Sequence, residues 1–131
     1  MTTTPAPPPA LPARTPPNPN PADYFDLIGT EVAGLGYRAQ PEALAALKPG
    51  DMLPLKREPT NQHDANAIMV GANTMRGPKH IGYLPRVQAP WLAAMMDHGH
   101  AMYARVESMS APGVTPPTLR VTLRMQRGAI P

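Results

Sequence analysis

The segment REPTNQHDANAI, residues 57–68, decides how the chain is organised, because it is a dense polar stretch between two apolar runs. Pro59 excludes a helix interior and favours an extended backbone at Glu58. The Asn and Asp side chains of the stretch favour tight turns, since they can bond nearby backbone amides. Apolar residues flank it at 52–55 and at 67–70. The pattern predicts a strand, a polar loop and a second strand, with functional groups gathered in the loop.

The composition divides the chain of 131 residues into a tail and one domain. Nine of the 20 prolines fall within residues 1–21, which have almost nothing to bury. We therefore expect residues 1–22 to form a disordered Pro-rich tail with extended polyproline character. Residues 23–131 are enough for a single core but not for two. Cys is absent, which excludes disulfides and thiolate metal sites.

Charge and hydropathy narrow the class of protein. No apolar run follows a basic start, as it does in a signal peptide. No apolar stretch approaches the roughly 20 residues that cross a bilayer. We therefore expect a cytoplasmic protein, with nucleoid association as an option. The net charge of +3 permits a polyanionic partner without requiring one.

Periodicity and turn signals predict six strands and two short helices. Strands are expected near residues 25–33, 52–57, 66–71, 81–84, 101–109 and 118–126, and residues 71–79 are expected to form a turn. One helix is expected over residues 41–48, opened by Pro41.

A second helix is expected over residues 87–98. One face of it carries Val87, Trp91, Ala94, Met95 and His98, and the helical apolar stripe places Trp91, Met95 and Met96 in or near the core. Many short strands with few helices are typical of a small barrel. The predicted fold is mainly β with two short helices, a small six-stranded OB-like or SH3-like barrel.

Four segments in this order resemble the HIRAN domain. They are VAGLGYR at 32–38, the Gly50-Asp51 step, REPTNQHDANAI at 57–68 and HIGYLPR at 80–86, and LAAMMDHG at 92–99 also fits. That domain occurs in the helicase-like transcription factor, in related DNA-damage-tolerance ATPases, and as small free-standing bacterial proteins. The resemblance implies a modified OB barrel that grips the 3′ end of single-stranded DNA, in DNA repair or replication-stress processing.

The resemblance also implies which residues contact DNA. By position in the motifs, Tyr37 and His63 stack on bases, Asp64 and Asn61 read the free 3′-hydroxyl, and Arg86 contacts phosphate. The family's basic residue before the stacking aromatic is Gly36 here, and Arg38 follows that aromatic instead. The implied DNA-binding residues are Tyr37, Arg38, Asn61, His63, Asp64, Tyr83 and Arg86.

These residue types suit the chemistry of a 3′-terminal nucleotide. An aromatic ring gains about 1–3 kcal/mol by stacking on a base, whatever the base. Phosphates need cations or backbone amides. A free 3′-hydroxyl can donate a hydrogen bond, and an ionised carboxylate such as Asp64 is an acceptor only. At an internal phosphodiester the hydroxyl is missing and phosphate charge repels the carboxylate, so Asp64 would select an end.

Each position also has a simpler structural explanation. Asn61 and Asp64 can cap turns, and Tyr37 or Tyr83 can pack at the rim of a barrel. A basic stripe on the polar faces of the last two predicted strands is typical of a solvated surface and could also add phosphate contacts. Its members are Arg105, Arg120 and Arg124.

We expect a non-enzymatic nucleic-acid-binding module whose ligand is single-stranded DNA or a DNA 3′ end, with a helicase or nuclease as a candidate partner protein. The alternative is a protein-interaction or adaptor domain that docks through its surface and its Pro-rich tail. A metal-dependent nuclease is disfavoured, because two-metal sites need several carboxylates. The four histidines match no established zinc spacing, so no metal or other cofactor is expected.

Overall fold

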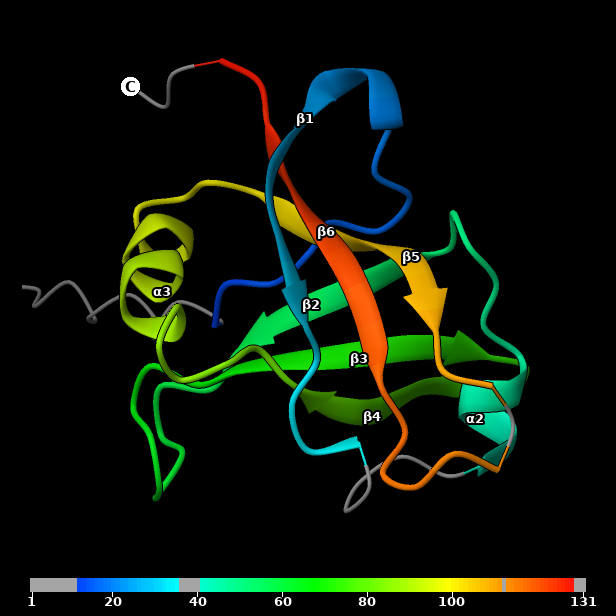
Figure 1. The fold of residues 1–131 in the computed structure, drawn as a ribbon. Coiled ribbons are helices and arrows are strands. Elements are labelled where there is room, and N and C mark those ends of the chain that lie inside the picture. The colour runs from blue at the N-terminus through cyan, green and yellow to red at the C-terminus, as the bar shows by residue number, and fades with distance from the viewer. Residues whose placement is uncertain (1–11, 36–40, 112, 129–131) are drawn as a thin grey trace, which may run out of the picture.

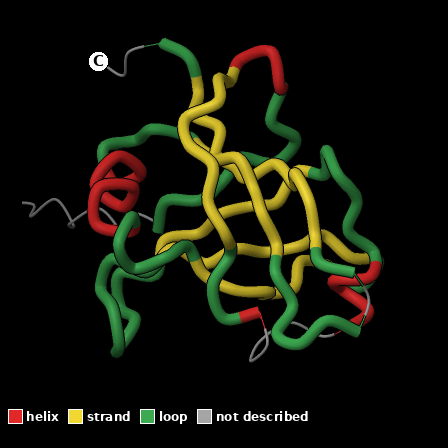
Figure 2. The backbone as a smooth tube through the Cα atoms, viewed as in Figure 1, coloured by secondary structure: helices red, strands yellow, loops and turns green. Residues whose placement is uncertain are grey.

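The computed structural model describes residues 12–35, 41–111 and 113–128. Within these ranges the chain forms six strands, the helices α2 and α3, and a 3₁₀ helix η1 (Figures 1 and 2). The strands are β1 Tyr24–Glu31, β2 Met52–Arg57, β3 Ile68–Thr74, β4 Gly77–Tyr83, β5 Met102–Met109 and β6 Leu119–Gln126. The helices are η1 Pro21–Asp23, α2 Pro41–Ala45 and α3 Ala89–Asp97. No helix in the described ranges is long and apolar enough to cross a membrane.

The six strands form one antiparallel sheet in the order β1-β6-β5-β2-β3-β4. The sheet curls so that its two edge strands approach each other, as Figure 2 shows. They meet at an isolated bridge between Ala33, just after β1, and Tyr83 at the end of β4. Two backbone hydrogen bonds of 2.8 and 2.9 Å form this bridge. The predicted mainly-β, OB-like fold with six strands is confirmed, and β1 and β4 remain edge strands of an open sheet.

Strand β2 connects the two halves of the sheet. Its first half, Met52–Pro54, pairs with β5, and its second half, Leu55–Arg57, pairs with β3. Pro54 lies where the strand changes partner, a position at which the missing N–H of proline is tolerated. The polar loop that follows β2 is consequently placed beside β3 and β4.

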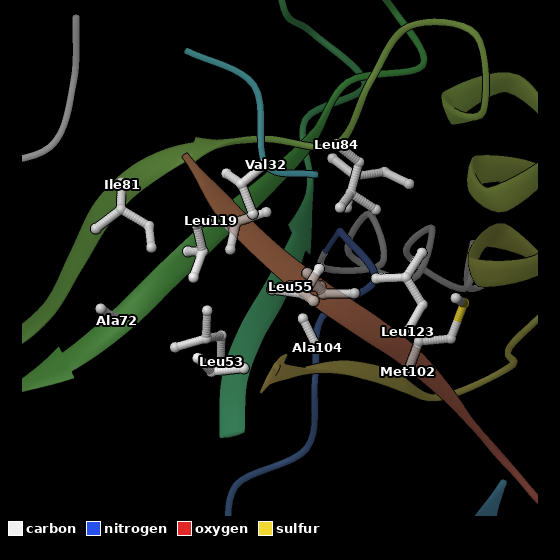
Figure 3. Close-up of a cluster of buried hydrophobic side chains, with 14 of the residues drawn as sticks. Val32, Leu53, Leu55, Ala72, Ile81, Leu84, Met102, Ala104, Leu119 and Leu123 are labelled. Carbon is white, nitrogen blue, oxygen red and sulfur yellow. The ribbon is translucent and has the colours of Figure 1, made fainter. Parts of the chain in front are cut away.

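The core lies inside the curl of the sheet and is built from alternating apolar positions (Figure 3). Strands β5 and β6 show the predicted alternation, because the inward residues are almost fully buried; they are Met102, Ala104, Val106, Leu119, Val121 and Leu123. Leu53 and Leu55 of β2 pack against them. Burial of this apolar surface stabilises the domain by about 25 cal/mol per Å² removed from water.

Residues 13–15 lie along β2, beside the half of the strand that β5 leaves (Figure 1). The Thr15 N–H donates to the Leu55 carbonyl at 2.8 Å, and the Arg57 N–H donates to the Ala13 carbonyl at 2.7 Å. The expectation of a disordered tail does not hold for these three residues, and residues 1–11 lie outside the described ranges. Backbone pairing explains the difference, because it requires no apolar pattern in the paired segment.

The turn expected over residues 71–79 is wrong, because most of these residues belong to strands. Strand β3 continues to Thr74 and β4 begins at Gly77, so only Met75 and Arg76 separate them. Gly77 has φ +97°, a left-handed conformation that suits a tight hairpin turn. Cross-strand pairing extends the hairpin through polar and proline residues with low intrinsic strand preference.

The packed face expected for the second helix is wrong in part: Met96 is buried and Met95 half-buried as expected, but Val87, Trp91, Ala94 and His98 are exposed. The buried residues of α3 are Ala89, Leu92, Ala93 and Met96. Val87 is 84% exposed and Trp91 is 40% exposed. The helix buries two leucine- and methionine-sized side chains and two alanines, Leu92, Met96, Ala89 and Ala93, and leaves Trp91 at the surface.

We predict that Gly82→Ala destabilises the domain by opening the bridge between the edge strands. An added Cβ would lie 2.5 Å from the Ala33 carbonyl oxygen and 2.6 Å from Val32 Cγ1. Overpacking of this kind costs about 1–3 kcal/mol, measurable by urea unfolding. Gly29→Ala is the control, because its Cβ would meet only ordinary contacts at 3.9 Å. Equal stability of the two variants would contradict the importance of the bridge.

Candidate nucleic-acid interface

Arg57 forms the base of the central loop, which we define as residues 58–67. It occupies the inward position after Leu53 and Leu55, and its side chain is only 4% exposed. The guanidinium donates to the carbonyls of Ala67 at 2.8 Å and Ala65 at 3.1 Å. A buried cation is tolerated when its donors are satisfied. Arg57 therefore ties the end of the loop to the barrel.

The same guanidinium joins the loop to helix α3. Arg57 Nε and Nη2 donate to the two carboxylate oxygens of Asp97 at 3.0 and 3.2 Å. This two-point geometry restricts the relative orientation of the partners more than a single bond would. The loop and the end of α3 are thus held in one arrangement.

The tip of the central loop is shaped by two short-range turns. Asn61 Oδ1 accepts hydrogen bonds from the backbone N–H groups of His63 at 2.8 Å and Asp64 at 3.1 Å. Asp64 Oδ1 accepts from the Asn66 N–H at 2.9 Å. Asx turns of this type set the backbone path of a loop. His63 is exposed and Asp64 half-buried, and Asp64 Oδ2 has no hydrogen bond to any described residue.

Glu58 connects the loop to the end of β4. Its Oε1 accepts from the Tyr83 hydroxyl at 2.7 Å and from Asn61 Nδ2 at 3.1 Å. Asn61 Nδ2 also lies 3.4 Å from the Tyr83 hydroxyl oxygen. The His80 ring meets the Tyr83 ring edge-on, with centroids 4.7 Å apart. These contacts hold Asn61 and Tyr83 beside each other.

The electrostatics of Glu58 follow from these contacts. Partial burial raises the pKa of the Glu58 carboxyl, but the hydrogen bonds from Tyr83 and Asn61 lower it, aided by the nearby charges of His80 and Lys56. The net effect is a pKa below the ordinary value. Glu58 is therefore an ionised carboxylate whose hydrogen-bonding capacity is partly used inside the site.

Arg86 places a cation at the loop tip. Its Nη2 donates to the His63 carbonyl at 3.3 Å, across 23 positions of the sequence. The structure thus brings together five of the seven predicted site residues: Asn61, His63, Asp64, Tyr83 and Arg86. Tyr37 and Arg38 lie outside the described residues, which end before them at Leu35, two positions beyond the Ala33–Tyr83 bridge.

The matching family model is that of the HIRAN domain, over residues 25–125. The chain belongs to the HIRAN domain family. This domain is a nucleic-acid-binding module, a binding domain rather than a catalytic one. Among solved structures, the chain is similar to a protein from Lactobacillus plantarum at 29% identity and a TM-score of 0.67, covering 78% of this chain and 94% of that one. It is also similar to the HIRAN domain of human HLTF at 26% identity and a TM-score of 0.55, covering 76% and 75%. The curated proteins contain no match.

Sequence reasoning missed two residues that organise this HIRAN site. Arg57 could have been found, because it continues the inward series Leu53 and Leu55 and so had to be buried with partners. Glu58 has a local partner in Asn61, but its hydrogen bond with Tyr83 spans 25 positions and leaves no pattern in the sequence. Only the pairing of β3 with β4 brings that hydroxyl to the carboxylate.

Carboxylates of this chain neutralise the basic stripe on β5 and β6. Arg105 and Arg124 both pair with Asp26, Arg105 also pairs with Glu107, and Arg120 pairs with Glu31. Hydrogen bonds, first of all from Arg105, lower the pKa of Asp26 and keep it ionised. The stripe therefore fits the solvated surface considered above. Across the described ranges, the acidic and histidine side chains form no group of three that could hold a metal ion.

We predict that Arg57→Met destabilises the domain by at least about 2 kcal/mol. The change removes two charge-assisted hydrogen bonds, those to the Ala65 and Ala67 carbonyls, which contribute about 1.5–3 kcal/mol each, although the Ala67 carbonyl keeps its bond from the Glu58 N–H at 3.0 Å. Urea unfolding measures the loss. Asp97→Asn is the companion variant and should cost less than Arg57→Met, because the half-exposed asparagine keeps one acceptor oxygen for the guanidinium and leaves the carbonyl bonds of Arg57 in place. A larger effect of Asp97→Asn than of Arg57→Met would contradict this assignment.

We predict that Glu58 makes stability depend on pH in the acid range. The folded-state pKa is depressed, so the stabilisation is present above the ordinary pKa of Glu, about 4.3, and is lost as pH falls through the folded value. Tyr83→Phe removes the strongest of the lowering bonds. Its free energy of unfolding should therefore fall less steeply than that of the parent between about pH 5 and pH 3.

Unfolding titrations across this range measure the difference. Glu58→Gln serves as the reference, because it cannot titrate at this position. Parallel curves of unfolding free energy against pH for the parent, Tyr83→Phe and Glu58→Gln would contradict the coupling between Glu58 ionisation and stability.

Proposed function

We propose that this HIRAN domain binds single-stranded DNA and recognises free 3′-hydroxyl ends, in DNA repair or replication-stress processing. The observation that supports this most directly is the surrounding of Asp64. One oxygen of its carboxylate is used in the loop turn, and the other has no hydrogen bond to a described residue. The exposed His63 is its neighbour, and the Arg86 cation bonds the same loop.

The proposed roles follow from what each group has available. Asp64 Oδ2 accepts the hydrogen bond of the terminal 3′-hydroxyl. His63 stacks on a base, because its ring is exposed and flat. Arg86 contacts a phosphate, since a cation at the loop tip offsets the repulsion between Asp64 and the DNA backbone. Tyr37 and Arg38 are assigned base stacking and phosphate contact on the resemblance alone.

Asn61 and Tyr83 have a supporting role in this proposal. Both ends of the Asn61 amide are occupied, with Oδ1 on the loop backbone and Nδ2 on Glu58. The Tyr83 hydroxyl donates to the same Glu58 oxygen. Asn61 therefore acts on the terminal nucleotide through the shape of the central loop, and Tyr83 lines the site through its ring.

The test compares oligonucleotides that differ only at the 3′ end. Fluorescence anisotropy with a 5′ label should show tighter binding of a 3′-hydroxyl than of a 3′-phosphate. A hydrogen bond to a charged group contributes about 1.5–3 kcal/mol, which corresponds to a preference of about 10- to 100-fold. Equal affinity for the two ends would overturn the proposal.

We predict that Asp64→Asn removes most of this preference while leaving the fold intact. The amide has the same shape but no charge, so it neither binds the hydroxyl as strongly nor repels a terminal phosphate. The same anisotropy titration measures the change. Asp23→Asn is the control, because it makes the same charge change at an exposed position in η1. Retention of the full preference in Asp64→Asn would assign the selectivity to another residue.

A further inference from the structure

The cations of the described surface are distributed unequally between the two halves of the sheet. On β5 and β6 each of the three arginines of the basic stripe has a carboxylate partner. Beside β2 the situation differs, because Arg14 and Lys56 are exposed and neither has an ion pair within the described residues. Two cations without an ion pair to a described residue therefore lie on the side of the sheet that carries the central loop.

The strand register aligns these two cations with the candidate site. Arg14 is paired with Lys56, Lys56 with Met69, and Met69 with Tyr83. Lys56 lies between the buried Leu55 and Arg57, so it faces outward. Paired residues of adjacent antiparallel strands share a face. Arg14, Lys56, Met69 and Tyr83 thus form one row across the outside of the sheet, which we call the outer row.

The outer row joins the central loop directly. Tyr83, at one end of it, donates to Glu58 of the loop. Lys56 lies two strand spacings from Tyr83, about 10 Å, and Arg14 lies three spacings from it, about 14 Å. The row is therefore a continuous surface that begins with an aromatic ring at the loop and ends with two cations.

The pairing of Arg14 with Lys56 is unfavourable in the absence of an anion. Like charges directly opposite each other on neighbouring strands destabilise a sheet. Glu58, whose pKa is lowered in part by the charge of Lys56, already accepts hydrogen bonds from Tyr83 and Asn61. An added anion between the two cations would relieve their repulsion, and phosphate suits both of these side chains.

We propose that the outer row binds the nucleotides that precede the 3′ end, with Arg14 and Lys56 contacting backbone phosphates. This inference rests on the proposed function and extends it from the terminal nucleotide to a longer single strand. It also gives the N-terminal segment a role, because the hydrogen bonds of Ala13 and Thr15 to β2 are what place Arg14 opposite Lys56.

The test combines oligonucleotide length with salt dependence. Binding of 3′-hydroxyl oligonucleotides of two and of eight nucleotides is measured by anisotropy from 0.1 to 1 M salt. Each phosphate contact to a single strand contributes about 0.7 to the slope of log K against log salt. Arg14→Ala and Lys56→Ala should each reduce the slope for the eight-nucleotide ligand by about 0.7. Over the tenfold range from 0.1 to 1 M salt, the binding constant of each variant should therefore change about fivefold less than that of the parent.

The double variant should reduce the slope by about 1.4, and none of these variants should change the binding of the two-nucleotide ligand. Arg127→Ala is the charge-matched control. It removes one exposed cation just after β6, a strand that does not neighbour β2, β3 or β4. It should leave the slope for both ligands nearly unchanged.

Three results would overturn the inference. If Arg14→Ala and Lys56→Ala behave like Arg127→Ala while Asp64→Asn still loses the 3′-hydroxyl preference, the outer row is wrong and the proposed function stands. If Arg14→Ala and Lys56→Ala weaken binding of the two-nucleotide ligand as much as binding of the eight-nucleotide ligand, the cations contact the terminal nucleotide rather than the nucleotides that precede it. If no oligonucleotide binds at all, both proposals fail together.

Discussion

The buried guanidinium of Arg57 is the interaction on which the candidate site depends. It is the last inward side chain of β2, and it ends that strand with hydrogen bonds to two loop carbonyls and a two-point ion pair to α3. A flexible polar loop loses conformational entropy when it is ordered for binding. In this HIRAN domain that entropy is lost during folding, before any ligand binds. The buried Arg57 guanidinium is stable only when its hydrogen-bond partners surround it, so it fixes the loop in one position.

The candidate site contains two carboxylates, which repel the phosphates of a nucleic acid, and the two differ in their hydrogen-bond partners. Glu58 is occupied by the Tyr83 hydroxyl and the Asn61 amide, and this satisfies its charge inside the protein. Asp64 keeps an oxygen without an internal partner. The two carboxylates therefore have different uses: one holds the loop in shape, and the other is available to an external donor. The Arg86 cation at the loop tip moderates the repulsion that both would exert on phosphate.

Backbone pairing sets the positions of residues that belong to distant parts of the chain. The Ala33–Tyr83 bridge brings the exit of β1 to the end of β4 and is the only point at which the described edge strands meet. The pairing of residues 13–15 with β2 adds Arg14 to the face that carries Lys56. Both contacts use N–H and C=O groups that every residue but proline has, so neither depends on a recognisable side-chain motif. They place part of a Pro-rich segment outside the matched family region beside β2 of the domain.

The sequence by itself determined the fold class, the succession of strands along the chain and the residues of the central loop, because these follow from local periodicity and turn chemistry. It also carried enough of the HIRAN motifs to indicate five site residues that the structure then brought together. It did not determine the face of α3 that packs, the extent of the β3–β4 hairpin or the pairing of residues 13–15. The pairing of residues 13–15 depends on a strand about 40 positions away, whereas the β3–β4 hairpin is extended by cross-strand pairing through residues of low strand preference. The tertiary structure alone decided that Glu58 holds Tyr83, since a hydrogen bond across 25 positions exists only after the strands have paired.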